Sequence, residues 1–348
     1  MVIPYGVLRV GYPYYKTIGM RRLTNWPISV AVGDDNNEVH ILCKGDGLTF
    51  IRRLTLDDED KGAFNLNGGP AAIGGPFIVD GDFSSVSGMI KDKEGNLVFS
   101  DEGNHKISKV SIKGELINQW GDHGNKDGEL NRPGALAEDP EGNLLVSDSQ
   151  NHRIQKFDSD GNFIFGFGSY GSAKGQFNTP WGIDVDSEGF IFVADWRNDR
   201  IQKFDSDGNF VSIFGKGSGS GEGELNRPAA VKVDEDGDIY IVDWANHRIQ
   251  LFAHDGHFVE KFIGDATLSD QARNYMITNM LAMRVREMTS IEPQKRLRWP
   301  ASVTVKNGLM FIPDYGSARI QIYKKDVLRL SEGEIAEKPR SHSLYTQF

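Results

Sequence analysis

The eleven residues RIQKFDSDGNF occur twice in this chain, at 153–163 and again at 200–210. Around both copies, four short apolar segments alternate with turns such as DSEG and DSDG. Such turns are typical of tight hairpins, because Asp supplies a side-chain acceptor and Gly tolerates a positive φ. A unit that recurs at a fixed spacing predicts a repeat protein, in which each unit packs on its neighbours.

The repeated pattern is clearest at 180–215, where four strands, A to D, are expected at 182–186, 190–194, 200–204 and 210–215. The pattern recurs in six units, at 27–56, 88–121, 133–168, 180–215, 228–264 and 300–326. An aspartate ends strand B in five of them, at Asp101, Asp148, Asp195, Asp243 and Asp314, and Cys43 takes this place in the first. We therefore expect six similar sheets.

A triplet beginning with Asn follows strand B in several units: NHK at 104–106, NHR at 151–153, NDR at 198–200 and NHR at 246–248. The chain resembles the NHL-repeat family from about residue 20 to residue 326. The resemblance lies in these triplets, in the turn residues, in the period and in the strand pattern. The resemblance implies an all-β fold, a six-bladed β-propeller in which each unit is one four-stranded blade. The triplet histidines His105, His152 and His247 are then expected to be structural.

The last unit stops at strand C. The segment YYKTIG at 14–19 matches the strand D pattern, so we expect the N-terminal segment to supply the outer strand of the last blade and to close the ring. We predict one propeller domain over 1–330, with insertions at about 57–85 and 265–299, followed by a C-terminal tail at 331–348.

The composition limits the class of partner. The net charge of −10 argues against nucleic acid as the main partner, because phosphate recognition needs clustered Lys and Arg. Cys43 is the only cysteine, so an internal disulfide is excluded. The N-terminal segment does not resemble a signal peptide, and no stretch of about 18 apolar residues occurs, so we expect a soluble, cytoplasmic protein with no membrane segment.

The two faces of the predicted ring differ. In an up-and-down blade the A–B and C–D turns share one face, and the B–C turns and D–A connections share the other, which we call the loop-rich face. Loops on a rigid ring commonly carry function, and Trp beside Arg is the composition of a binding hot spot. The candidate ligand-binding residues of these loops are Arg132, Trp181, Trp196, Arg227, Trp244, Arg298 and Tyr315.

The second insertion is predicted to be helical, with Ser269 as the N-cap of DQARNYMITNMLAMRVREM. Its methionines fall on one apolar stripe, which makes Met276 and Met280 further candidates for ligand contact. The helix is either a Met-rich cap over the loop-rich face or a segment packed permanently on the propeller rim. A basic patch at 284–298 keeps RNA binding open as a third hypothesis.

Charged residues on the inner strands are unusual, because unpaired buried charge is costly. One explanation is pairing between adjacent blades, Lys91 with Glu138 and Asp184 with Lys232. The other is catalysis, with Glu138, Asp184 or Lys232 as acid–base groups. His123 lies on the loop-rich face outside the repeat pattern and is a fourth catalytic candidate.

No cofactor is predicted. Amidating lyases that resemble this fold bind zinc through histidines that follow the blade proline, whereas the matching residues here are Ile28, Ser87, Gly134, Trp181, Ala229 and Ala301. No three-histidine zinc site is therefore expected. A divalent metal in the central channel stays open, but lactonase-type propellers also use an axial Asn, and the inner rows provide only Glu138 and Asp184.

Two classes of function remain. The first is a binding platform that grips a small molecule, a peptide or a protein on the loop-rich face. The alternative is a lyase or hydrolase with its active site in the central channel at the same face, under the helical lid.

Overall fold

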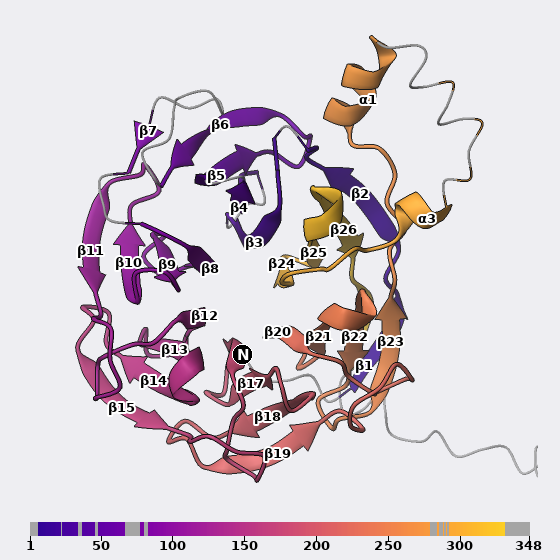
Figure 1. The fold of residues 1–348 in the computed structure, drawn as a ribbon. Helices are drawn as coiled ribbons and strands as arrows, with labels where there is room; N and C mark the ends of the chain where they lie inside the picture. The colour runs from indigo at the N-terminus through magenta and orange to yellow at the C-terminus, as the bar shows by residue number, and fades with distance from the viewer. Residues whose placement is uncertain are drawn as a thin grey trace, which may run out of the picture.

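The structure, a computed structural model, describes residues 6–21, 23–33, 37–45, 48–66, 77–79, 83–278, 284, 288, 290 and 292–330. Six sheets stand around a central axis, each with strand A innermost (Figure 1). The six-bladed β-propeller predicted from the repeats is therefore confirmed.

The strands of each blade follow in order from the axis outward. Blade 1 is β3 (Pro27–Val32), β4 (Val39–Gly45), β5 (Leu48–Leu54), β6 (Asp60–Asn65) and β7 (Phe77–Ile78). Blade 2 is β8 (Val86–Lys91), β9 (Leu97–Asp101), β10 (Lys106–Val110) and β11 (Leu116–Trp120), and blade 3 is β12 (Pro133–Glu138), β13 (Leu144–Asp148), β14 (Arg153–Phe157) and β15 (Phe163–Phe167). Blade 4 is β16 (Pro180–Val185), β17 (Ile191–Asp195), β18 (Arg200–Phe204) and β19 (Phe210–Phe214), and blade 5 is β20 (Pro228–Val233), β21 (Ile239–Asp243), β22 (Arg248–Phe252) and β23 (Phe258–Phe262). Blade 6 is β24 (Thr304–Lys306), β25 (Leu309–Asp314), β26 (Arg319–Lys324) and β2 (Tyr14–Ile18).

Apolar side chains of adjacent blades form the core. All five residues of β17 are buried, because neighbouring blades cover both faces of this strand, whereas β19 at the outer edge alternates. Phe192 and Ile201 of blade 4 lie in one apolar cluster with Val231 and Ile241 of blade 5. Complete burial of such side chains contributes about 1.5–3 kcal/mol each, so each blade depends on its neighbours.

The aspartate that ends strand B organises the turn that follows it. Asp148 is fully buried, and its carboxylate accepts hydrogen bonds from Asn131 N–H at 2.7 Å and Arg153 Nε at 2.8 Å. Gln155 Nε2 donates to the same carboxylate at 3.0 Å. The pattern repeats at Asp195, Asp243 and Asp314. The recurring RIQ of strand C is thus explained, because its Arg and Gln both bind the blade aspartate.

The N-terminal strand closes the ring. β2 pairs with β26 in antiparallel register, with Ile18 opposite Ile320. Ile18 is fully buried in a cluster that joins blade 6 to blade 1. The predicted closure of the last blade is confirmed, and Ile18 anchors the closing strand in the core.

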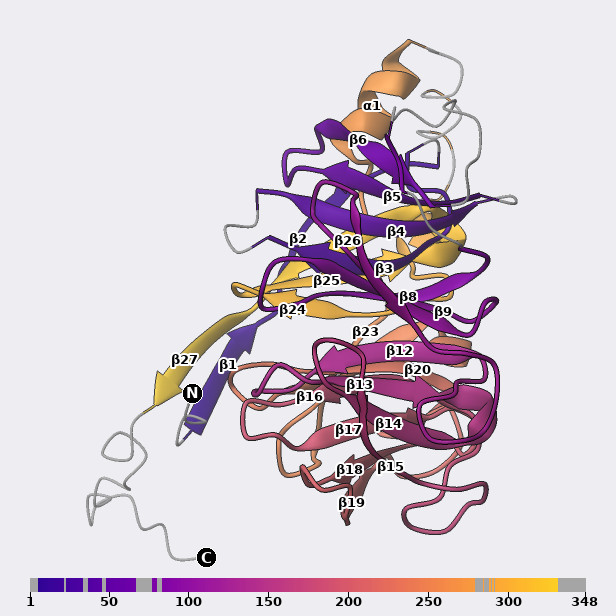
Figure 2. The same cartoon turned by 90° about the vertical axis from the view of Figure 1, so that its left-hand side faces the viewer.

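Three features lie outside the regular blades. A two-stranded ribbon of β1 (Gly6–Gly11) and β27 (Asp326–Leu330) projects from the face opposite the loop-rich face (Figure 2). The outer strand β6 lies within the stretch 57–85 that the sequence predicted as an insertion, so the connection to blade 2 begins only after it. Residues 67–76 and 80–82 of that stretch are outside the described residues, as is the tail at 331–348.

The second insertion contains α1 (Asp270–Ile277) and α3 (Glu292–Lys295). Ser269 Oγ accepts the Ala272 N–H at 3.1 Å, so the predicted N-cap is confirmed. Asp58 accepts the Gln271 N–H at 2.7 Å, which attaches α1 to the outer edge of the ring (Figure 1). In the part of the chain that is described, no helix has the length and apolar character needed to cross a bilayer.

Candidate functional site: the cavity of the loop-rich face

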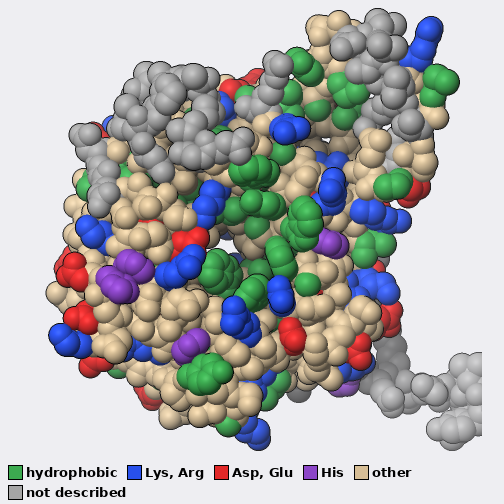
Figure 3. All heavy atoms as spheres, viewed as in Figure 1, with side chains coloured by type: hydrophobic (Ala, Val, Ile, Leu, Met, Phe, Trp, Pro, Cys, Tyr) green, Lys and Arg blue, Asp and Glu red, His purple; other side chains and the backbone are tan. Residues whose placement is uncertain are grey.

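A cavity of about 580 Å³ opens at the centre of the loop-rich face. This face is turned to the viewer in Figures 1 and 3, and Figure 3 shows apolar and basic side chains around the central hollow. Its walls come from the residues that follow strand B and from the D–A connections. Three of the B–C turns are short 3₁₀ helices, η2 (Ser149–Asn151), η3 (Trp244–Asn246) and η4 (Tyr315–Ser317).

Aromatic side chains line the cavity on the side of blades 4, 5 and 6. They are Trp181, Trp196, Trp244, Trp299 and Tyr315. The repeat places one residue directly after the blade proline and one directly after the blade aspartate at this mouth. In these blades the residue after the aspartate is aromatic each time, whereas the residue after the proline is aromatic only at Trp181. Trp181 and Trp244 pack partly against the core between blades 5 and 6, so part of the aromatic wall is fixed by the fold.

Two of the rings are held by cationic side chains. The Trp196 ring faces the guanidinium of Arg197 at 5.6 Å and that of Arg227 at 5.1 Å. Arg298 lies 5.7 Å from the Trp299 ring, which also meets His247 edge to face at 5.4 Å. Cation–π contacts at exposed sites contribute about 0.5–1 kcal/mol, so they orient the indoles while leaving them accessible.

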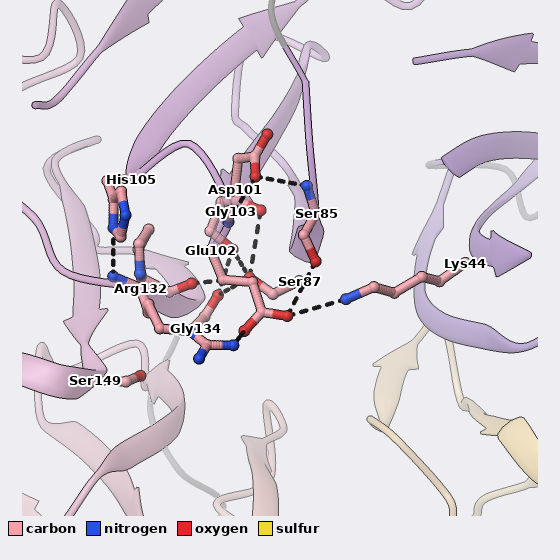
Figure 4. A network of polar contacts seen from close by, with 12 residues as sticks. Lys44, Ser85, Ser87, Asp101, Glu102, Gly103, His105, Arg132, Gly134 and Ser149 are labelled. Carbon is pink, nitrogen blue, oxygen red and sulfur yellow. Dashed lines mark hydrogen bonds and ion pairs between the residues drawn. The ribbon is translucent and has the colours of Figure 1, made fainter. Parts of the chain in front are cut away.

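A charged network forms the wall on the side of blades 1 and 2 (Figure 4). Glu102 accepts hydrogen bonds from Lys44 Nζ at 3.0 Å, Ser85 Oγ at 3.1 Å and Arg132 Nη2 at 3.1 Å. Burial by itself raises the pKa of Glu102, but the bonds and charges of Lys44 and Arg132 outweigh burial and hold the pKa below its usual value. Glu102 is therefore a counter-ion at neutral pH.

The cavity carries a positive charge in an acidic protein. Among its described lining residues, Lys44, Arg132 and Arg197 are cationic and Glu102 is the one carboxylate, which leaves a net charge of +2. The whole chain carries −10. Cationic side chains beside an aromatic wall suit a ligand that has both an apolar part and an anionic group.

Five of the nine ligand-binding candidates from the sequence line this cavity: Arg132, Trp181, Trp196, Trp244 and Tyr315. Arg227 and Arg298 lie beside it, against the indoles of Trp196 and Trp299. Met276 lies on α1 at the outer edge of the ring, away from the central opening (Figure 1), and Met280 is outside the described residues. The described part of the helical insertion does not form the expected cap.

Lys44, Glu102, Arg197 and Trp299 also line the cavity but were not among the ligand-binding candidates from the sequence. Lys44 follows Cys43, the residue that replaces the blade aspartate, just as Glu102 follows Asp101. The position after the aspartate is therefore the signal that finds both residues. It was overlooked at Lys44 because the first repeat is degenerate.

The charged inner-strand residues lie elsewhere. Glu138, Asp184 and Lys232 line an axial channel of about 530 Å³, at the ends of their strands next to the A–B turns. They are thus at the end opposite the loop-rich face, and the expectation of an active site at that face under a helical lid is wrong for these residues. Lys232 Nζ lies 2.7 Å from Asp184 Oδ1, so the predicted pair between adjacent blades is present. Glu138 accepts the backbone N–H of Lys93 at 2.9 Å.

His123 does not lie outside the repeat pattern, as the sequence reasoning assumed. It bridges to Leu130 in the way that Tyr170 bridges to Phe177 in the next unit, so it occupies the same repeat position. Its ring lies 4.3 Å from the ring of His105. It is not among the residues that line the cavity.

The residues at the position after the blade proline, which is replaced by Val86 in blade 2, converge at the cavity mouth: Ile28, Ser87, Trp181, Ala229 and Ala301 line both the cavity and the channel. None of them can bind zinc through an imidazole. Within the described ranges, no three His, Cys, Asp or Glu side chains are arranged to hold a metal ion.

Comparison with known proteins agrees with this architecture. The NHL repeat family matches at residues 130–157, 177–204 and 225–252, which run from the D–A connection to strand C. Blades 3, 4 and 5 thus each contain a segment that matches the NHL repeat. No curated protein matches this sequence.

Solved structures share the six-bladed propeller fold at low identity. Virginiamycin B lyase from Staphylococcus aureus is 12% identical, with 91% of this chain and 100% of that chain covered and a TM-score of 0.54. The gluconolactonase XC5397 from Xanthomonas campestris is 12% identical, with 92% and 100% covered and a TM-score of 0.57. A chain of a nidogen/laminin complex is 18% identical, with 84% and 93% covered and a TM-score of 0.53. At these identities the likeness concerns the fold alone.

Proposed function

We propose that this NHL-repeat propeller is a binding protein whose loop-rich face receives a ligand with an aromatic or apolar part and an anionic group. The observation that carries the proposal is the division of the cavity, with aromatic rings from blades 4 to 6 on one side and Lys44 and Arg132 on the other. Such a ligand is a small molecule or a side chain and acidic group of a peptide or protein.

The charged groups favour binding over catalysis. Asp184 and Lys232 neutralise each other at the far end of the channel. Glu102, the carboxylate of the cavity, is held ionised by two cations and has no proton to donate at neutral pH. The fold occurs in a lyase, in a gluconolactonase and in a nidogen/laminin complex, so the choice between functions rests on this site.

Two further properties are part of the proposal. The overall charge of −10 speaks against a nucleic-acid backbone as the ligand. Cys43 is buried and is the only cysteine, so folding needs no oxidising compartment, which supports a cytoplasmic location.

The test uses 2-naphthalenesulfonate, an aromatic anion, and 2-naphthylmethanol, its neutral counterpart, in titrations followed by calorimetry and tryptophan fluorescence. We expect saturable binding of the sulfonate, weaker binding of the alcohol, and a loss of about tenfold or more in sulfonate affinity on Trp196→Ala or Arg132→Gln. Tyr275→Ala is the matched control, because Tyr275 is an exposed aromatic residue of α1 and lies outside the cavity. Equal affinity for both probes, or unchanged affinity in both cavity variants, would overturn the proposal.

A further inference from the structure

One hydrogen bond recurs at four blade junctions and fixes the rim of the cavity. In each case, the middle residue of the NHL-type triplet accepts the backbone N–H of a residue in the D–A connection of the following blade. The bonds run from Arg132 N–H to His105 Nδ1 (3.0 Å), Thr179 N–H to His152 Nδ1 (3.1 Å), Trp299 N–H to His247 Nδ1 (3.0 Å) and Arg227 N–H to Asp199 Oδ1 (2.7 Å). We call them the rim clasps.

The donors of the rim clasps are residues of the binding cavity. Arg132, Thr179 and Trp299 line it, and Arg227 covers the indole of Trp196. All eight partners have φ between 51° and 59°. Side chains other than glycine rarely adopt this conformation, least of all β-branched or bulky ones. Each clasp therefore joins two residues of unusual backbone conformation at the rim. Trp26 and Ala318 adopt the same conformation at the junction of blades 6 and 1, where Ala318 offers no side-chain acceptor, so the clasp adds a side-chain bond to a conformation that the fold itself supports.

The chemistry of the acceptor differs among the four clasps. An imidazole accepts at Nδ1 only when it is neutral and carries its proton on Nε2, because a protonated imidazole donates from both nitrogens. The carboxylate of Asp199 accepts throughout the range in which histidine titrates. Three clasps are thus sensitive to pH near neutrality, and one is not.

Positive charge and burial surround the histidine clasps. His105 faces His123, Arg132, Asp101 and Asp148; His152 faces Arg197, Asp195 and Asp148; and His247 faces Arg298 and Asp314. Each imidazole also lies against a ring of the next connection, which is His123, Tyr170 or Trp299. Burial first, and then the neighbouring cations, hold the pKa of all three histidines below the usual 6.5. The clasps are therefore closed at neutral pH.

We propose that His105, His152 and His247 are positioning residues that make ligand binding at the loop-rich face dependent on pH. Neutral imidazoles hold Arg132, Thr179 and Trp299 in place, and protonation releases them. This inference rests on the proposed binding function of the cavity. In an open clasp the histidine has its ordinary pKa. The free energy needed to open a clasp therefore begins to fall only when the pH drops below about 6.5, where the released imidazole takes up a proton.

Simple electrostatics predicts the opposite trend, which makes the inference easy to contradict. Lowering the pH adds positive charge to the protein and by itself strengthens the binding of an anion. The sulfonate of 2-naphthalenesulfonate stays ionised, and the low pKa of Glu102 keeps the carboxylate of the cavity ionised as well. Weaker binding at low pH therefore reports the opening of the clasps.

The first experiment measures the affinity of 2-naphthalenesulfonate at about pH 7.5 and about pH 5. We expect the wild type to lose about fivefold or more, and His105→Asp/His152→Asp/His247→Asp to keep its affinity, because aspartate already serves in the Asp199 clasp and tolerates this backbone conformation. Asp199→His is the reverse control and should steepen the dependence. Absence of binding at pH 7.5 would contradict the proposed function, whereas unchanged or tighter wild-type binding at pH 5 would contradict only the clasp inference.

The second experiment needs no ligand and no variant. Nitrogen-15 NMR of the imidazoles should show neutral rings protonated at Nε2 at pH 7.5. Amide hydrogen exchange, corrected for its intrinsic pH dependence, should show that the Arg132, Thr179 and Trp299 amides lose protection at about pH 5 while the Arg227 amide keeps it. The same response at all four amides would contradict the inference.

Discussion

The ammonium of Lys325 lies 2.6 Å from the carboxylate of Asp234, in a contact that joins residues 91 positions apart. The same ammonium reaches Asp236 at 2.8 Å and Asp238 at 3.0 Å, and the Lys325 side chain is only 4% exposed. Tyr12 donates its hydroxyl hydrogen to Asp238 at 3.0 Å. Segments near both ends of the described chain are thus attached to one acidic turn of blade 5.

Replacing Lys325 should be strongly destabilising, because it removes the cation shared by three buried carboxylates, of which Asp236 still pairs with Arg329. We expect Lys325→Met to lower the free energy of unfolding by about 3–5 kcal/mol at neutral pH, measured by guanidinium denaturation. The penalty should shrink as the pH falls towards about 4, because burial holds the pKa of Asp234 above its usual value and this carboxyl then takes up a proton. Lys324→Met is the control, since Lys324 is exposed and should change stability by less than about 0.5 kcal/mol. A penalty that does not depend on pH would contradict the electrostatic explanation.

The Lys325 contact should also persist at alkaline pH. Burial by itself lowers the pKa of Lys325, but the surrounding carboxylates outweigh burial and raise the pKa above its usual value. A raised lysine pKa gives stability that is complete below the unfolded pKa of about 10.4 and is lost only as the pH rises through the folded value. The stability difference between wild type and Lys325→Met should therefore stay constant from about pH 7 to 9 and decline above about pH 10.4. A decline that begins near pH 8 would show that the ammonium is poorly stabilised.

The blade aspartates should matter more than any surface aspartate. Asp148→Asn removes the charge that binds Arg153 and turns an NH₂ group toward donors, so we expect a loss of about 3 kcal/mol in the free energy of unfolding. Asp160→Asn, in an exposed C–D turn, is the control and should cost less than about 0.5 kcal/mol. Scanning calorimetry measures both. Equal melting temperatures for the two variants would show that the buried network contributes little.

Two residues of the closing strand β2, Ile18 and Tyr15, test whether the strand stabilises the ring through its apolar packing. Ile18→Ala in β2 should cost about 2–4 kcal/mol, because Ile18 is fully buried between blades 6 and 1. Tyr15→Ala in the same strand should cost less than about 1 kcal/mol, because Tyr15 is 50% exposed. Urea denaturation gives both values. Similar losses at the two positions would mean that β2 acts through its backbone pairing rather than through its apolar face.

Glu102 should compete with an anionic ligand for Lys44 and Arg132. We expect Glu102→Gln to tighten binding of 2-naphthalenesulfonate by about fivefold, equivalent to about 1 kcal/mol for a partly exposed ion pair. Glu141→Gln makes the same change in net charge at an exposed position away from the cavity and should leave the affinity unchanged. Calorimetric titration distinguishes the two. Weaker binding in Glu102→Gln would indicate that the carboxylate holds the two cations in place for the ligand.

The local pattern of the chain predicted the fold well. Turn residues such as those in DSDG, the alternating strands and the blade aspartate all act within one unit, so each copy could be recognised from its own residues. The N-terminal strand was predictable for the same reason, because 14–19 carries the pattern of a strand D. The outer strand of blade 1 was missed because DKGAFN at 60–65 lacks that pattern.

The candidate site was predictable only in part. Trp181, Trp196 and Trp244 stand at repeat positions that must reach the central opening, so the repeat alone places them. Lys44 and Glu102, 58 residues apart, form their ion pair because blades 1 and 2 are adjacent in the ring. The position of α1 could not be derived from its apolar stripe, since that position depends on a bond to Asp58 in another blade.

By itself, the sequence determined six blades, their strand order and the way the ring closes, because short-range periodicity and turn chemistry specify a β-sheet unit residue by residue. Only the tertiary structure decided which side chains share a space. The aromatic and cationic walls of the cavity, the lysine within the acidic turn of blade 5 and the histidines that hold the rim all join residues from different turns. The physical reason is that such contacts depend on the radius and stagger of the assembled ring, which no single repeat encodes.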